Sequence, residues 1–171
     1  MPHAATAHPR VPNPSPTLPG ARVRLRAVTA ADAAALLEIS VYDGVAAQNE
    51  AAALEQVERI AGDQARGETV HWAIEDATRC ALVGTVGFYR GFVDGVGEVG
   101  YVLRPAHRRR GFMTEAVALA VAFGFDALGL EAVVAHTDAT NGASIAVLER
   151  CGFVPAGADG ERRIYRVDRP I

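Results

Sequence analysis

The chain has no lysine, and all 17 of its Lys or Arg side chains are arginine. Schiff-base chemistry and a lysine nucleophile are therefore excluded. Cysteine is also scarce: Cys80 and Cys151 are the only two, and they form no C-x-x-C pattern. This argues against a disulfide framework and against a cysteine-ligated zinc site. The longest apolar run, residues 116–125, is too short to cross a bilayer.

A strong net charge is missing as well. The 171 residues carry a formal net charge of −3, and 50% of them are hydrophobic. This composition is typical of one globular domain, and not of a disordered or nucleic-acid-binding chain. The sequence does not open with the charged and then apolar pattern of a secretion signal. We expect a cytoplasmic protein, monomer or homodimer, that binds neither nucleic acid nor a membrane.

Proline is concentrated near the N-terminus, and apolar periodicity is almost absent there. A Pro-rich segment without apolar periodicity cannot bury enough surface to fold by itself. We therefore expect a disordered leader over residues 1–20, followed by a single domain over residues 21–171.

Within this domain, strand-like alternation and helix-like periodicity follow one another in short segments. Only residues 96–136 show the strand–helix–strand order of a parallel crossover, and the other strands are joined as antiparallel pairs. The fold class is therefore α/β, with a mixed sheet and helices on both faces. The strands are expected at residues 22–26, 69–75, 81–89, 96–103, 130–136, 153–155 and 162–167, and the helices at 31–40, 50–62, 112–128 and 141–151.

The segment after the strand at 96–103 combines the features of an anion site. Arg108, Arg109 and Arg110 precede Gly111, and a long apolar helix follows. The first N–H groups of a helix have no partner inside it, so they can hold a di- or triphosphate, and arginine adds forked donors. The alternative is a solvated basic turn. The absence of G-x-G-x-x-G and G-x-x-x-x-G-K excludes a doubly wound dinucleotide fold and a P-loop.

The order of elements and two motifs resemble the GNAT N-acetyltransferases, and in particular the branch that acetylates ribosomal-protein N-termini. The motifs are GEVGYVLRPAHRRRGFMTEA, residues 97–116, and NGASIAVLERCGF, residues 141–153. The family's phosphate loop reads Arg/Gln-x-x-Gly-x-Gly/Ala, and the segment from Arg108 to Met113 fits it except that Met113 replaces the small last residue. The resemblance implies a mostly antiparallel sheet with one splayed parallel strand pair.

The resemblance also implies an enzyme that moves an acetyl group from acetyl-CoA to a primary amine by direct attack in a ternary complex. The acceptor would be a protein N-terminus or a small molecule, and no metal is expected. The pyrophosphate would lie on the bend before the helix, and the pantetheine arm along the preceding strand. The cofactor-binding residues would be Val102, Leu103, Arg104, Arg108, Arg109, Arg110, Gly111, Phe112, Met113, Thr114, Asn141 and Ser144.

Acetyl transfer needs one group to take the amine proton and another to protonate the leaving thiolate. Glu98, which matches a glutamate of the branch, is the candidate base, acting through water; the alternative is a solvated strand carboxylate. Leu148 stands where many family members have a tyrosine, so Ser144 is the candidate donor to sulfur, unless it is a surface or capping serine. A backbone amide at Val102 or Leu103 would stabilise the oxyanion.

The acceptor groove is expected between the loop 41–49, the start of the helix 50–62 and the final hairpin. His136 ends a strand beside the expected acetyl site, where it is a base, an acceptor-orienting group or a structural residue. Two functions of another class stay open: a catalytically silent CoA-binding module, and a nucleotide-binding protein that uses the same anion loop. The expected substrate-binding residues are Tyr42, Trp72, Tyr89 and His136.

Overall fold

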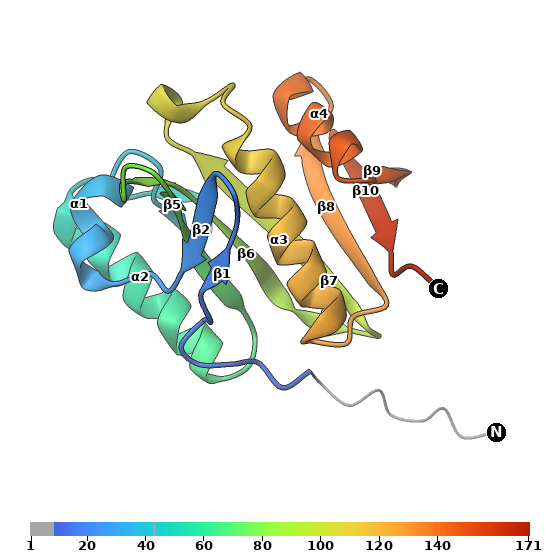
Figure 1. Cartoon of the computed structure of the whole chain (residues 1–171), viewed down its shortest axis with the longest axis horizontal. Helices are drawn as coiled ribbons and strands as arrows, with labels where there is room; N and C mark the ends of the chain where they lie inside the picture. Colours follow the sequence, from blue (N-terminus) through green and yellow to red (C-terminus); the bar gives the residue numbers. More distant parts are fainter. Residues whose placement is uncertain (1–8, 43) are drawn as a thin grey trace.

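The computed structural model describes residues 9–42 and 44–171, whose main element is an eight-stranded sheet (Figure 1). The helices are α1 (Ala33–Leu36), α2 (Glu50–Ala65), α3 (Phe112–Asp126) and α4 (Gly142–Arg150), and 3-10 turns precede α1 (Ala30–Asp32) and α3 (Pro105–His107). The strands are β1 (Leu18–Pro19), β2 (Val23–Arg26), β3 (Val41–Tyr42), β4 (Val45–Ala46), β5 (Val70–Asp76), β6 (Leu82–Val93), β7 (Val96–Leu103), β8 (Ala132–Asp138), β9 (Val154–Asp159) and β10 (Arg162–Asp168).

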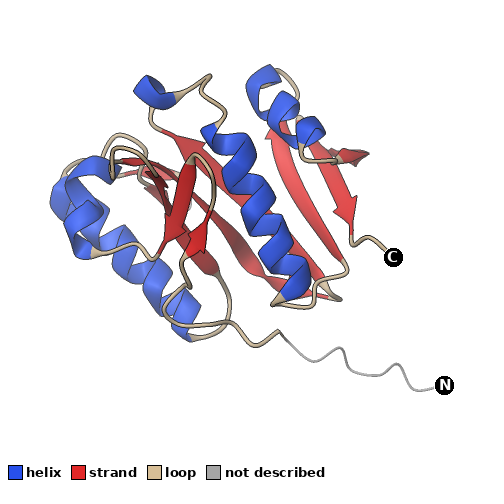
Figure 2. Cartoon of the chain, viewed as in Figure 1, coloured by secondary structure: helices blue, strands red, loops and turns tan. Residues whose placement is uncertain are grey.

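The strand order in the large sheet is β1-β2-β5-β6-β7-β8-β10-β9. All neighbouring strands are antiparallel except β7 and β8, which are parallel and joined by α3. Figure 2 shows the helices packed around this sheet. The predicted fold class is therefore confirmed, including the single parallel pair.

The sheet has two covered faces because side chains alternate along each strand. On β5, Val70, Trp72 and Ile74 join the main core with α3, whereas Ala73 joins a smaller core with Leu36 of α1. Helix α3 is apolar on nearly all sides and buries most of its length, as its sequence predicts. No helix within the described residues is long and apolar enough to cross a membrane.

The parallel strands β7 and β8 separate soon after they pair. Val96, Gly97 and Glu98 pair with residues 132–134 of β8, and no later pair joins the two strands. Strand β8 instead continues beside β10 up to Asp138. The last part of β7 thus has a free edge within the sheet, as the predicted splay requires.

The helix predicted over residues 31–40 is much shorter than expected. The Asp32 carboxylate accepts hydrogen bonds from the Thr29 N–H and the Arg26 guanidinium, which ties the start of this segment to β2. Leu36 and Ile39 both enter the core, and the Ile39 N–H donates to the Leu36 carbonyl in a turn. Burial of both side chains therefore ends the helix early, before the small β3–β4 hairpin.

The predicted disordered leader also differs from the structure over residues 9–20. The Ser15 hydroxyl donates to the His71 carbonyl at 2.7 Å, and the Trp72 indole N–H donates to the Pro16 carbonyl at 2.8 Å. Strand β1 then pairs with β2. Proline lacks an N–H but keeps its carbonyl acceptor. The segment can therefore accept hydrogen bonds from side chains of the domain although it forms no helix and no long strand. The first eight residues lie outside the described part of the chain.

Candidate active site

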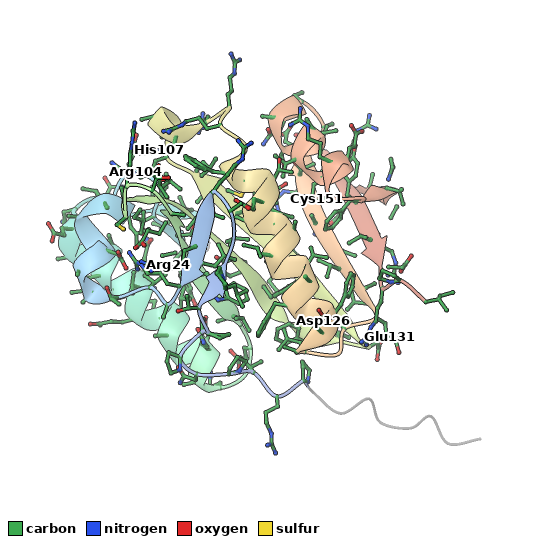
Figure 3. All side chains as sticks on the ribbon, in the orientation of Figure 1. Arg24, Arg104, His107, Asp126, Glu131 and Cys151 are labelled. Atoms are coloured by element: carbon green, nitrogen blue, oxygen red, sulfur yellow. The ribbon has the colours of Figure 1, made fainter. Side chains whose placement is uncertain are left out.

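The chain passes from β7 into α3 through an arginine-rich bend. Arg109 and Gly111 both have positive φ, 61° and 76°. Among the described residues, no backbone carbonyl accepts from the amides of Arg109 to Met113, and the first helical bond runs from Glu115 N–H to the Gly111 carbonyl. Unpaired amides at the positive end of a helix dipole are the donors that an anion requires. Figure 3 labels Arg104 and His107 at this end of the molecule.

The three arginines of the bend differ in their surroundings. The Arg110 guanidinium lies 4.8 Å from the centre of the Phe112 ring and 4.0 Å from the Asp76 carboxylate. Arg108 and Arg109 are exposed. The side chain of Arg110 is therefore engaged by the protein, whereas those of Arg108 and Arg109 extend into solvent, where a phosphate would approach.

The side chains of three other predicted cofactor contacts are engaged by the protein itself. The Arg104 guanidinium donates to the Glu38 carboxylate and to the Leu82 carbonyl, each at 3.2 Å, because the side chain turns toward α1 and β6. The side chains of Phe112 and Met113 are buried in the core. These two residues thus offer only their amides to a ligand, and Arg104 offers no free guanidinium.

The free edge of β7 carries unpaired backbone groups. The Arg104 N–H donates to the Val83 carbonyl of β6. Since N–H direction alternates along a strand, the amide of Val102 also points to β6, opposite its partner there, and those of Tyr101 and Leu103 point into the gap. Of the two amides predicted for the oxyanion, only that of Leu103 therefore points into the gap. An extended chain could pair with this edge as an added strand.

Helix α4 contacts the last part of β7. Asn141 caps the helix, because its side-chain oxygen accepts from the Ser144 N–H at 3.1 Å. The Ser144 hydroxyl lies 2.9 Å from the Tyr101 hydroxyl. Burial raises the pKa of Tyr101 to about 12, so this phenol keeps its proton at neutral pH. Leu148 is fully buried and has no polar atom to offer.

A groove of about 910 Å³ lies on the opposite face of the sheet, where α1 and α2 pack. It is lined by the segment after α1, by α2 and by the central strands, and it includes Tyr42, Tyr89 and Arg162. The loop after α1 and the final hairpin thus contribute as predicted, but α2 contributes its middle and end instead of its start. Gly100 leaves room for the Tyr89 ring, since a Cβ there would lie 3.1 Å from it.

Glu98 faces this groove with two basic side chains beside it. Its Oε1 lies 3.2 Å from His136 Nδ1 and 3.5 Å from Arg90 Nη1. Arg90 has a φ of 65° and belongs to a bulge of β6, between Tyr89 and Phe92, that lies opposite Glu98. The structure therefore brings together a carboxylate, an imidazole and a guanidinium at the point where β7 and β8 part.

The sequence predicts that Trp72 lines the acceptor groove, but this prediction is wrong. It is fully buried on the α3 face, and its ring packs edge-on against Phe123 at 5.2 Å between centres. Its neighbour His71 takes the groove position, with its ring 5.7 Å from that of Tyr89. Burial lowers the pKa of His71 to about 4, so it is neutral at pH 7. Alternation along β5 could have identified His71 once the face of Trp72 was known.

Comparisons with known proteins give a consistent result. Residues 22–154 match the family model of the acetyltransferase (GNAT) domain. The chain is 31% identical over 150 residues to an uncharacterized N-acetyltransferase of Bacillus subtilis (strain 168), YoaA, and the match covers 83% of this chain and 85% of the relative.

Solved structures share the fold at lower identity. RimJ of Mycobacterium smegmatis, solved in complex with CoA-disulfide, is 20% identical with a TM-score of 0.76, and the match covers 85% of this chain and 81% of that one. The ribosomal-protein-S5-alanine acetyltransferase of Vibrio fischeri is 18% identical with a TM-score of 0.74, and the match covers 90% of this chain and 97% of that one.

Proposed function

The chain belongs to the GNAT acetyltransferase family, and on that premise we propose that it transfers an acetyl group from acetyl-CoA to a primary amine. The acceptor is the N-terminus of a protein or a small molecule. The free edge of β7 carries this proposal, because it leads from the unpaired amides of the bend to the groove that holds Glu98. The CoA-disulfide bound by the RimJ relative supports the choice of co-substrate.

The donor side of the site has the groups that acetyl-CoA requires. This co-substrate would supply the acetyl group as a thioester. The amides of the bend hold its diphosphate, and the exposed Arg108 and Arg109 add charge around it. The outward backbone groups of Tyr101 and Leu103 hold the pantetheine arm as an added strand.

The acceptor side lies on the groove face of the sheet. An α-amino group has a pKa of about 7.7–8.0, so part of it is already neutral near pH 7. Glu98 attracts the ammonium form, and groove water carries its proton away. The Leu103 amide, which points into the gap, donates to the carbonyl oxygen as it gains negative charge.

The leaving sulfur is protonated from the other face. The Tyr101 and Ser144 hydroxyls, 2.9 Å apart, act there as a donor pair in place of the family tyrosine that Leu148 replaces. Direct attack without a covalent enzyme intermediate is favoured, because burial raises the pKa of the Cys151 thiol, which donates to the Thr114 carbonyl at 3.4 Å.

A screen of primary amines with acetyl-CoA, followed by thiol release, tests this function. We expect turnover of at least one amine, and a lower kcat in Glu98→Gln and Ser144→Ala with CoA-induced thermal stabilisation unchanged. Glu131→Gln, an exposed carboxylate at the far end of β8 (Figure 3), is the control with unchanged kcat.

The same measurements separate the other functions. Stabilisation by CoA without turnover of any amine would identify a silent CoA-binding module. Stabilisation by ATP or NAD but not by CoA would identify a nucleotide-binding protein instead.

A further inference from the structure

We propose that Glu98 and His136 act as a carboxylate–imidazole pair, in which His136 takes the proton of the acceptor ammonium and Glu98 orients its ring. This inference rests on the proposed acetyl transfer and identifies the base within that site. It begins from the 3.2 Å distance between Glu98 Oε1 and His136 Nδ1.

The backbone brings the two side chains to the same face. Glu98 is the last residue of β7 that pairs with β8, and its partner is Val134. Val133 and Ala135 belong to the main core on the α3 face, so alternation places Val134 and His136 on the groove face. His136 therefore stands one pleat beyond the last paired residue, at the opening of the gap, facing Glu98.

The His136 imidazole is only partly exposed to solvent. Nδ1 is buried, and its geometry makes no hydrogen bond with any described residue, although the Glu98 oxygen is within ion-pair distance. The His136 side chain is 20% exposed. In the neutral Nδ1–H tautomer, the ring would direct Nδ1–H toward Glu98 and leave the lone pair of Nε2 as the proton-accepting position.

An imidazole is also a better match for this proton than a carboxylate. Unperturbed pKa values are about 4.3 for glutamate, about 6.5 for histidine and about 7.7–8.0 for an α-amino group. Proton transfer from the ammonium to a lone carboxylate therefore costs much more free energy than transfer to an imidazole. Catalysis by a base is most effective when its pKa lies near the working pH.

Glu98 supplies the negative charge that lies close to His136 on the groove face. Arg90 and Arg162 are cations on the groove face and oppose a further positive charge there. Asp138, on the same strand, is held by hydrogen bonds from Thr140. Burial raises the pKa of Tyr89, which stays neutral. The carboxylate of Glu98 is thus the close negative charge that stabilises the imidazolium.

The proposed step is balanced in protons and electrons. The ammonium N–H bond breaks, and its proton passes to His136 Nε2. The freed lone pair forms the bond to the acetyl carbon, the nitrogen gives its second proton to groove water, and the C–S bond breaks with its electron pair on sulfur. The sulfur takes a proton from the Tyr101–Ser144 pair, which water reprotonates, and His136 returns its proton to water.

The test is the pH dependence of kcat in wild type, His136→Asn, Glu98→Gln and the control Glu131→Gln, with two acceptors of different amine pKa. One limb of the pH profile of kcat reports the titration of an enzyme group, and we call it the enzyme limb. Its midpoint stays at the same pH when the acceptor changes. We expect His136→Asn to lower kcat by about a hundredfold and to remove this limb. Glu98→Gln should move the limb to lower pH, because the anion that stabilises the imidazolium is gone, and Glu131→Gln should match wild type.

Other outcomes separate this inference from the proposed function. If His136→Asn and a second variant, His136→Gln, bind CoA as wild type does and keep the enzyme limb, the pair is wrong while acetyl transfer stands. If wild type acetylates no amine, the proposed function fails, and an NMR titration of the His136 ring decides the pair alone. A His136 pKa that is the same in wild type and Glu98→Gln would overturn it.

Discussion

Successive side chains of β7 point to opposite faces of the sheet. Glu98 and Gly100 face the groove, whereas the Tyr101 hydroxyl lies 2.9 Å from the Ser144 hydroxyl of α4. The side chains proposed as base and acid therefore project from opposite faces of β7, beside the edge where β7 and β8 part.

Removing either hydroxyl of the Tyr101–Ser144 pair tests the acid side. We expect Tyr101→Phe and Ser144→Ala each to lower kcat by roughly ten- to a hundredfold, with the KM for acetyl-CoA nearly unchanged. Since the two hydroxyls act as one donor, the double variant should lose no more than a single one. Steady-state kinetics of the three variants measure this.

Ser15→Ala provides the matched control for that experiment. It also removes a hydroxyl that donates a hydrogen bond, to the His71 carbonyl, but from the segment before β1, away from the gap. It should lower the free energy of unfolding by roughly 1–3 kcal/mol without changing kcat. Losses in Tyr101→Phe and Ser144→Ala that simply add would contradict a shared proton donor.

At the scale of elements, the bend before α3 is the feature that the sequence located best. A strand followed by arginines, a glycine and an apolar helix is a local pattern, and each part of it is formed as expected. The short segment after β2 shows the opposite case: its pattern predicts a helix over residues 31–40, but core burial ends that helix at Leu36. Local periodicity does not show which side chains will be buried by strands that lie far away in the chain.

The positive φ of Gly111 gives a prediction for the bend. An added Cβ at a φ of 76° costs roughly 1–2 kcal/mol and shifts the neighbouring amides. Gly111→Ala should therefore weaken CoA binding by about tenfold, as expected for the loss of one amide–phosphate hydrogen bond. Isothermal titration with CoA measures the change.

Gly129→Ala is the control, because Gly129 has a similar φ of 68°, follows the other end of α3 and would place its Cβ in open space. Both variants should lose similar stability, and only Gly111→Ala should lose affinity for CoA. Equal CoA affinity in the two variants would argue that the amides of the bend do not hold the diphosphate.

At the scale of the whole molecule, stability depends on His71, a histidine buried beside Tyr89 on the groove face. Burial lowers the pKa of His71 to about 4, whereas in the unfolded chain it is near 6.5. Below pH 6.5 the unfolded state binds the proton first, so the free energy of unfolding should fall as the pH drops from 6.5 toward 4. The full effect is on the order of 3 kcal/mol.

Urea denaturation of wild type and His71→Gln between pH 7.5 and 4.5 tests this dependence. In His71→Gln, the free energy of unfolding should depend less on pH than in wild type. In His107→Gln, this dependence should be the same as in wild type. Parallel curves for wild type and His71→Gln would show that the imidazole is not the group that titrates.

The sequence by itself determined the elements whose signals are local: α2, α3, α4, most strands and the arginine-rich bend before α3. Periodicity, glycine and helix-end chemistry act over a few residues, so they can be read in order along the chain. For the same reason the two motifs indicated the family before any contact was known.

Only the tertiary structure decided which side chains meet. Sheet register placed His71 in the groove and Trp72 in the core, opened the edge beside Leu103, and brought Glu98 to His136. These contacts depend on where strands far apart in the chain pair and where they separate. That outcome is set by the packing of the whole sheet against its helices, and no local pattern encodes it.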